Sequence, residues 1–256
     1  MSFVTSVRSE LIKVKRSSAF WLSILGAGFI PFIFLLMYYF RAKDFVPRMA
    51  DEPWGNHIQH GWQALSAFLL PMFVILTCSL VTQIEYKNNT WKQVYASPQS
   101  LGNIFFSKLS IIHCMILFCY LLFNLCMLGS GLLTNLLNKN YTFFSKPVHW
   151  DMLLRMNFKS YISVLGIASI QYWLSLRFKN FIASIGIGLA LLITSLIIMD
   201  WEQIYKVPFA FPLLTFDSVF RKRHLLIENH EWNSIAWFIT CTTLAFFDLK
   251  YRKERG

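Results

Sequence analysis

The sequence predicts an all-α membrane protein with six transmembrane helices, an N-terminal interfacial helix and a short cytoplasmic helix between spans 2 and 3. Hydrophobic residues make up 55% of the 256 residues and charged residues 14%, whereas soluble domains carry about 25% charged residues. The mean hydropathy is +0.47. Several stretches approach the length of about twenty uncharged residues that crosses a bilayer as a helix. This composition leaves little room for a folded soluble domain.

Six apolar runs define the predicted spans within a single domain that covers residues 1–256. Because the runs are continuous and do not alternate, they predict helices and not the strands of a barrel. The first run is also too long for a cleavable signal and has no small-residue cleavage site. The spans are residues 19–40, 62–84, 109–129, 161–176, 181–199 and 232–247.

Basic residues predict the orientation of the spans, because cytoplasmic segments are enriched in Lys and Arg. With a cytoplasmic N-terminus, the inner segments hold 13 basic and 4 acidic residues, and the outer loops hold 11 basic and 9 acidic residues. Both termini are therefore expected in the cytoplasm. The net charge of +11 is interpreted as a topology signal, so no nucleic-acid partner is expected.

Residues 1–18 have the spacing of an amphipathic helix that lies on the inner membrane surface before the first span. Phe3, Val7, Leu11 and Val14 fall on one face. A plain basic anchor that faces anionic lipid explains the charges equally well, so both interpretations stay open. The charged positions that lie elsewhere on this elbow are Arg8, Glu10, Lys13, Lys15 and Arg16.

The predicted spans contain no Asp, Glu, Lys or Arg, which argues against a proton-driven transporter and an intramembrane metalloprotease. His113 is interpreted as a satisfied polar residue. His57 and His60 lie three apart in the first outer loop without further ligands, so they are taken as interfacial and no metal site is expected. The chain also has no GxxxxGK[ST] loop, so it is not expected to be an enzyme.

Two other features concern packing. Small residues recur four apart in the fifth span and predict a helix-packing or dimer face: Ser184 and Gly188, and Gly186 and Ala190. Tyr38, Tyr39 and Trp62 are interpreted as an interfacial aromatic belt, with a cargo rim as the alternative. In the loop 200–231, the Pro-bounded residues 207–214 are too short to span and are expected to dip partway into the bilayer.

The polar segment between spans 2 and 3 has its own helical pattern. Asn88 or Asn89 is a suitable N-cap, and Trp91, Val94 and Tyr95 then form one apolar face. Pro98 follows, and the residue before a proline disfavours helix. Such a face either lies on lipid or inserts into a groove on a cytoplasmic partner, and its short, bracketed form favours docking.

The motif Glu85-x4-Thr90-Trp91-Lys92-Gln93-x4-Pro98, followed by Phe106-x-Lys108, resembles the signature of the membrane subunits of ABC-2 type transporters. The basic N-terminal tail is similar to their elbow helix. Within that family, the length and the Asn-Asn-Thr-Trp-Lys run most resemble the permeases of lantibiotic immunity and bacitracin-type export.

The resemblance implies that a coupling helix at about 88–97 sits in a cleft of a separate ATPase, which would bind ATP and Mg, while this chain binds no cofactor. The residues implied in coupling are Glu85, Asn89, Thr90, Trp91, Lys92, Val94, Tyr95 and Pro98. It further implies a homodimer, or a heterodimer with a second permease, in the bacterial cytoplasmic membrane.

The expected function is ATP-driven export of an amphipathic or hydrophobic cargo, a peptide or a lipid-like molecule, as in antimicrobial peptide immunity. Apolar side chains of the first, second and fifth spans would line the path. The alternative is a non-transporting membrane scaffold that uses an ATPase to regulate partner proteins. A membrane-embedded enzyme is disfavoured, because the spans contain no polar constellation.

Overall fold

The computed structural model describes residues 3–15, 17–87, 99–178, 180–221 and 225–251, and within these ranges all regular structure is helical. The two N-terminal helices are followed by a region of short helices, four long helices and a C-terminal pair. The elements are α1 (Phe3–Lys15), α2 (Ser18–Phe40), α3 (Ala42–Arg48), α4 (Pro53–Ala64), the π-helical turn η1 (Leu65–Leu69), α5 (Leu70–Lys87), α7 (Leu101–Leu137), α8 (Trp150–Arg177), α9 (Phe181–Ile197), the 3₁₀ turns η2 (Ile204–Lys206) and η3 (Pro208–Ala210), α10 (Phe211–Phe220) and α11 (Asn229–Tyr251).

Three of the long helices begin at residues whose side chains cap them. The Ser17 hydroxyl accepts from the backbone N–H of Ala19 at the start of α2, and the Ser100 hydroxyl accepts from Asn103 at the start of α7. The Asn180 side chain accepts from Ile182 at the start of α9. These side chains satisfy backbone N–H groups that have no partner within the helix, so the sequence itself fixes where the three helices begin.

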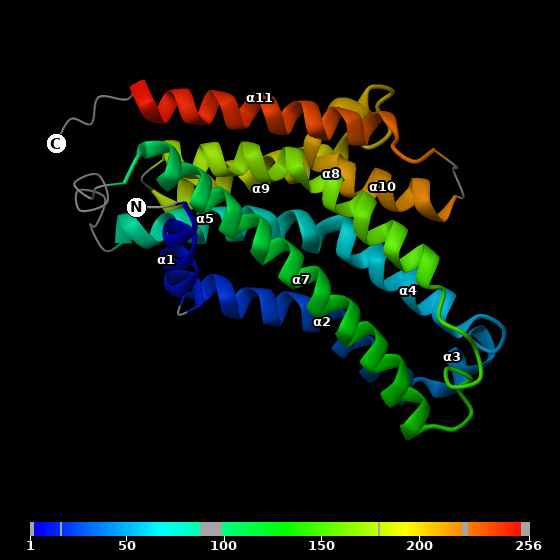
Figure 1. Cartoon of the computed structure of the whole chain (residues 1–256). Coiled ribbons are helices and arrows are strands. Elements are labelled where there is room, and N and C mark those ends of the chain that lie inside the picture. Colours follow the sequence, from blue (N-terminus) through cyan, green and yellow to red (C-terminus); the bar gives the residue numbers. More distant parts are fainter. Residues whose placement is uncertain (1–2, 16, 88–98, 179, 222–224, 252–256) are drawn as a thin grey trace.

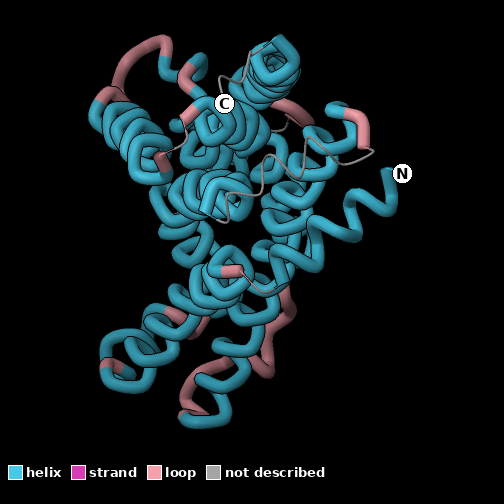
Figure 2. Tube along the Cα trace, turned by 90° about the vertical axis from the view of Figure 1, so that its left-hand side faces the viewer, coloured by secondary structure: helices cyan, strands magenta, loops and turns pink. Residues whose placement is uncertain are grey.

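The long helices form one bundle around α5, which contacts α2, α7, α8 and α9. α8 packs along α11 and α10, and α7 packs along α2. The start of α1, the end of α5, the start of α7 and the end of α11 all lie at the same end of the bundle (Figure 1). Figure 2 looks onto this end, where the long helices are seen close to end-on.

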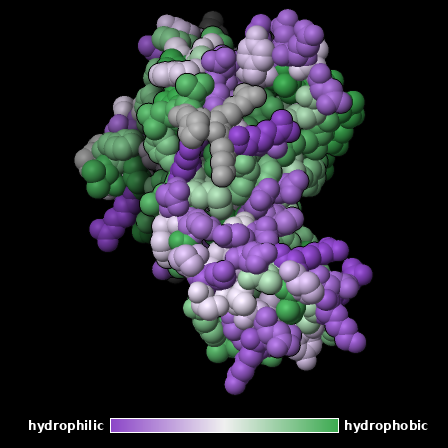
Figure 3. Space-filling model, turned by 90° about the vertical axis from the view of Figure 1, so that its right-hand side faces the viewer, coloured by the Kyte–Doolittle hydropathy of each residue, from purple (hydrophilic) through white to green (hydrophobic). Residues whose placement is uncertain are grey.

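Three helical segments of the described chain are long and apolar enough to cross a membrane: Ser18–Phe40, Pro53–Tyr86 and Leu101–Leu137. α9 and residues Pro208–Phe220 are apolar but shorter, so the six-span count stays a prediction, as does the position of α1 on a membrane surface. Figure 3 faces the end opposite the start of α1. Hydrophilic residues gather across the lower half of this view, and hydrophobic residues lie along its upper right edge. This distribution fits a multi-pass membrane protein.

Several helices extend beyond the apolar runs that predicted them. α7 covers 101–137 where the run covers 109–129, and α8 covers 150–177 where the run covers 161–176. α4, η1 and α5 are continuous from residue 53, nine residues before the predicted second span. An apolar run ends at the first charged residue, but the helix itself can continue. Lys108 of α7 and Lys159 of α8 lie buried in the turns beyond the runs. Buried carboxylates of other helices, Glu85 and Glu231, pair with them there.

The region predicted as the first outer loop is largely helical, and its aromatic residues enter the core. Tyr38 and Trp62 are buried and Tyr39 is exposed, so the belt interpretation was wrong for Tyr38 and Trp62. The buried His57 ring donates from Nε2 to the Met127 carbonyl (3.0 Å), which leaves Nδ1 to accept from the Tyr38 hydroxyl (3.0 Å). His60 is exposed. His57 thus holds α2, α4 and α7 together.

The Pro-bounded stretch before the last helix folds into η2, η3 and the start of α10. Phe209, Ala210 and Phe211 are buried, and η3 packs against α8, α9 and α11. Irregular backbone at membrane depth requires such a protein cover, so the packing is compatible with the expected partial insertion, which stays a prediction.

Candidate functional site

Four charged side chains from three helices meet at the end of the bundle where α1 begins. α1 contributes Glu10 and Lys13, α5 contributes Glu85 and α7 contributes Lys108. Lys108 Nζ lies 2.7 Å from Glu10 Oε2 and 2.5 Å from Glu85 Oε1. Lys13 Nζ lies 2.6 Å from Glu10 Oε1 and 3.1 Å from Glu85 Oε1. Each ammonium therefore contacts both carboxylates, and we call this ring the charged quartet.

Burial of the quartet carries a free-energy cost, because its charged groups are removed from water. The side chains of Glu85 and Lys108 are each 1% exposed and that of Glu10 is 9% exposed, whereas that of Lys13 is 34% exposed. Removing an ion from water costs several kcal/mol, and the cost is offset only where opposite charges and hydrogen bonds surround it. With two carboxylates and two ammonium groups the quartet is neutral. Losing any one member leaves a net charge among largely buried side chains.

The quartet also determines which face of α1 packs on the bundle. The buried residues Ser6, Glu10 and Val14 recur every four positions, whereas Phe3 and Leu11 of the predicted apolar face are exposed. Glu10, which the sequence places off the predicted apolar face, therefore lies on the face of α1 that packs on the bundle. The contacts of Glu10 with Lys108, and the hydrogen bond from Ser6 Oγ to Gln99 Oε1 (3.2 Å), select this face.

The ionised forms of the α1 residues are stabilised in the folded chain. Burial alone opposes ionisation of Glu10, but the charges and hydrogen bonds of Lys108 and Lys13 outweigh it and lower the Glu10 pKa below its ordinary value. Burial likewise opposes the charge on Lys13, yet Glu10 and Glu85 raise its pKa. Glu10 and Lys13 are thus both charged at neutral pH.

Acidification is expected to remove the stability that Glu10 contributes. Because its folded-state pKa is lowered, this contribution is fully present above the ordinary glutamate pKa of about 4.3 and is lost as the pH falls through the lower folded-state value. The difference in Tm between the wild-type chain and Glu10→Gln, measured in detergent from about pH 7 down to about pH 3, should therefore shrink toward zero. A pH-independent difference would contradict the ion-pair role.

The residues predicted for the elbow helix and for ATPase coupling fall into three groups. Glu10, Lys13 and Glu85 come together in the quartet, although the sequence assigned them to two separate elements. Arg8 and Lys15 are exposed on α1. The remaining predicted positions lie outside the described residues: Arg16, Asn89, Thr90, Trp91, Lys92, Val94, Tyr95 and Pro98. Glu85 and Lys108 lie on the two helices that flank residues 88–98.

A second polar set lies at the centre of the bundle, where α5, α8 and α9 meet. Gln171 Nε2 donates to Ser79 Oγ (3.2 Å) and to the Ser184 carbonyl (3.0 Å), and Ser175 shares a hydrogen bond with Ser184 (2.8 Å). Of the predicted small-residue positions, Ser184 and Gly188 are buried in this contact, whereas Gly186 and Ala190 are exposed. The two pairs therefore face in different directions.

The role of Lys108 was missed from sequence, although it belongs to the quoted motif. A signal was present, because Phe105, Leu109 and Ile112 share its helix face and are all buried. A lysine on such a face needs a buried carboxylate partner. The buried pair of Lys159 and Glu231 (3.2 Å) was also missed. Both residues lie just outside the apolar runs and were therefore assigned to loops.

Comparison with protein families places these features in context. Residues 6–195, about three quarters of the chain, match the family described as "ABC-2 family transporter protein". The chain belongs to this family. The match includes the whole charged quartet. Membership makes the ABC-2 chain a transmembrane component of an ABC transporter and implies association with an ABC ATPase. No curated protein and no solved structure shows significant similarity to it.

Proposed function

We propose that this ABC-2 chain is the permease subunit of an ATP-driven exporter that moves an amphipathic or hydrophobic cargo out of the cytoplasm or the membrane. The observation that carries the proposal is the charged quartet, which connects the two helices flanking residues 88–98 both to each other and to α1. A displacement of that segment by a cytoplasmic partner would reach α1, α5 and α7 together.

In this mechanism residues 88–97 form a coupling helix that docks in a separate ATPase, which binds ATP and Mg. The permease itself catalyses no reaction. Closure of two ATPases on ATP draws the coupling helices of a homodimer, or of a heterodimer with a second permease, toward each other. The quartet keeps α1, α5 and α7 in register during this movement, so the membrane helices shift between two arrangements.

The cargo class follows from the exposed surface of the long helices. α2 exposes Trp21, Phe29 and Phe32, and α9 exposes Ile182 and Ile193. The second predicted span, α5, is mostly buried within the chain, so α2 and α9 would contribute more to a lumen than α5. An aromatic and aliphatic lining suits a membrane-active peptide or a lipid-like molecule, as a role in antimicrobial peptide immunity would require. We place the chain in a bacterial cytoplasmic membrane, and the distribution of Lys and Arg supports both termini inside.

Removal of the two aromatic side chains in the coupling segment is expected to abolish ATPase binding. The experiment is affinity purification of the full-length chain from detergent-solubilised membranes, with the wild-type and the Trp91→Ala/Tyr95→Ala variant compared by mass spectrometry. Trp201→Ala/Tyr205→Ala is a matched control, because it removes the same residue types at the same spacing from exposed positions near the opposite end.

An ABC ATPase should co-purify with the wild-type and control chains, and should be lost from the coupling variant at unchanged Tm. Retention by the coupling variant would contradict the docking role of residues 91 and 95. The rate of ATP hydrolysis with and without added cargo then distinguishes an exporter from a scaffold, since only an exporter is expected to hydrolyse ATP faster when its cargo is added.

A further inference from the structure

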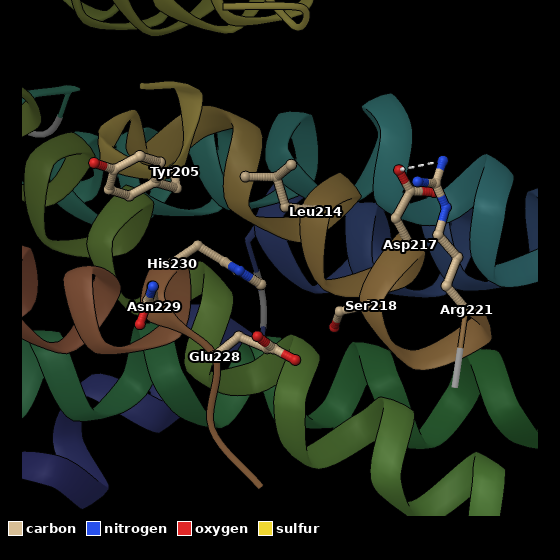
Figure 4. Close-up of a pocket in the computed structure, with 8 residues that line it drawn as sticks. All are labelled: Tyr205, Leu214, Asp217, Ser218, Arg221, Glu228, Asn229 and His230. Carbon is tan, nitrogen blue, oxygen red and sulfur yellow. Dashed lines mark ion pairs between the residues drawn. The ribbon is translucent and has the colours of Figure 1, made fainter. Parts of the chain in front are cut away.

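The end of the bundle away from the start of α1 contains a pocket that the proposed function does not use. It lies between α10, η2 and the first turn of α11 and has a volume of about 260 Å³. Figure 4 shows Asp217 and Ser218 of α10 and Arg221, which follows it, on one side, and Glu228, Asn229 and His230 on the other. Two carboxylates and one guanidinium therefore line it.

Glu228 is the unusual member of the lining. The residue is 6% exposed, and its Oε1 atom meets no hydrogen-bond partner among the described residues. In Figure 4 its carboxylate points from the chain before α11 toward Ser218 of α10. A buried ionised carboxylate is costly unless a cation or hydrogen-bond donors compensate it. An oxygen of this kind on the wall of a pocket indicates a missing donor.

Among the described residues, the cations near this segment, Lys159 and Arg221, are paired with other carboxylates. Lys159 Nζ pairs with Glu231 (3.2 Å) and donates to the Leu225 carbonyl (3.2 Å). Glu231 Oε2 in turn accepts from the backbone N–H of Glu228 (2.8 Å). Arg221 lies 4.0 Å from Asp217 at the exposed rim. Lys159 thus neutralises Glu231 and fixes the segment that carries Glu228, while the Glu228 side chain faces the pocket.

We propose that this pocket binds an ammonium or guanidinium group, with Glu228 as the buried acceptor and Asp217 as a second carboxylate at the rim. Such a group supplies both the charge and the donor that Glu228 Oε1 requires, and charge-assisted hydrogen bonds of this type are the strong ones. A metal ion fits less well, because the described residues contain no cluster of three metal-ligating side chains. The proposal does not depend on ATPase coupling.

Two sources carry this chemistry: a lysine or arginine side chain of a peptide, and the ethanolamine headgroup of a lipid. The test uses the full-length chain in neutral maltoside detergent at about 0.15 M salt, which screens non-specific attraction. Fluorescence anisotropy follows a dye-labelled tetralysine peptide and, in parallel, the same peptide with acetylated side chains. Short-chain phosphatidylethanolamine serves as competitor, and short-chain phosphatidylglycerol is its control without an ammonium group.

Glu228→Gln is expected to weaken tetralysine binding at least about tenfold, as loss of a buried charge partner does, and Asp217→Asn should weaken it less. Glu202→Gln, which changes an exposed carboxylate outside the pocket, should leave the affinity within about twofold. Glu228→Gln should not lower Tm, because it removes an uncompensated charge, so failed folding cannot imitate the result.

Competition by phosphatidylethanolamine but not phosphatidylglycerol would identify the lipid headgroup as a ligand, and binding without competition would identify the peptide side chain. Equal affinity for the acetylated peptide would overturn the proposal. So would equal effects of Glu228→Gln and Glu202→Gln, or no binding of either ammonium source by the wild-type chain.

Discussion

Lys108→Met is expected to destabilise the chain by about 3–5 kcal/mol, because it leaves a buried charge of the quartet uncompensated. Within the quartet, Lys13, which is partly exposed, would then remain to compensate both Glu10 and Glu85, and the quartet would carry one net negative charge. For a chain of this size the loss corresponds to a fall in Tm on the order of 10 °C. Thermal unfolding in detergent measures it.

Two further variants separate the lost charge from the lost side chain. Lys15→Met makes the same replacement at an exposed position of α1 and should change stability by less than about 0.5 kcal/mol. The triple variant Glu10→Gln/Glu85→Gln/Lys108→Met removes both buried carboxylates together with Lys108. It should recover most of the stability, since neutral groups of similar volume often replace a buried ion pair without loss. A triple variant less stable than Lys108→Met would contradict the electrostatic explanation.

The same triple variant tests whether the quartet transmits motion. Residues 88–98 are unchanged in it, so an ATPase should still co-purify. Without charged contacts between α1, α5 and α7, however, cargo should stimulate ATP hydrolysis less than in the wild-type complex. Full stimulation in a stable triple variant would limit the quartet to a structural role. Stability and coupling are thus separable readouts of one set of residues.

The sequence predicted the helical class and the ABC-2 family, because these depend on local composition and on one short motif. It identified Glu10, Lys13 and Glu85 but assigned them to separate elements. Their meeting depends on how α1 turns toward α7, and a side chain 98 residues away in sequence leaves no local pattern. The quartet is a tertiary feature.

Helix ends were predicted less well than helix centres, again for a physical reason. Apolar runs stop at the first charge, yet α7 and α8 continue through Lys108 and Lys159 because carboxylates on other helices neutralise them. Tertiary contacts also explain why the aromatic-belt interpretation was wrong for Tyr38 and Trp62. Their amphipathic side chains suggested a membrane interface, but the hydrogen bond of Tyr38 to His57 and the packing of Trp62 against Phe123 place them in the core.

Gly188→Leu is expected to be the second strongly destabilising substitution. A Cβ atom at residue 188 would contact Gln171 Oε1 directly and approach Ile75 Cγ2 at 2.9 Å. Gln171 cannot move aside freely, because its amide donates to Ser79 and Ser184. Overpacking costs about 1–3 kcal/mol, and breaking the buried amide contacts adds about 1–3 kcal/mol. The expected result is a marked fall in Tm in detergent.

Gly186→Leu is the matched control, because Gly186 is exposed and a Cβ there meets nothing within 4 Å. It should leave the Tm of the single chain nearly unchanged. Gln171→Ala/Gly188→Leu should lose less stability than the sum of its single changes, since the shortened residue 171 makes room for the leucine. Additive losses would show that the clash with Gln171 is not the cause.

Gly188→Leu and Gly186→Leu together distinguish packing within one chain from dimer formation as the role of the small residues in α9. Gly188 lets α9 approach α5 and α8 within one chain, so its substitution should act on Tm even in a monomer. Gly186 and Ala190 face outward, so a dimer that used this face would dissociate in Gly186→Leu at unchanged Tm. Size-exclusion chromatography with light scattering would detect that change, and an intact dimer would assign the outward face to lipid.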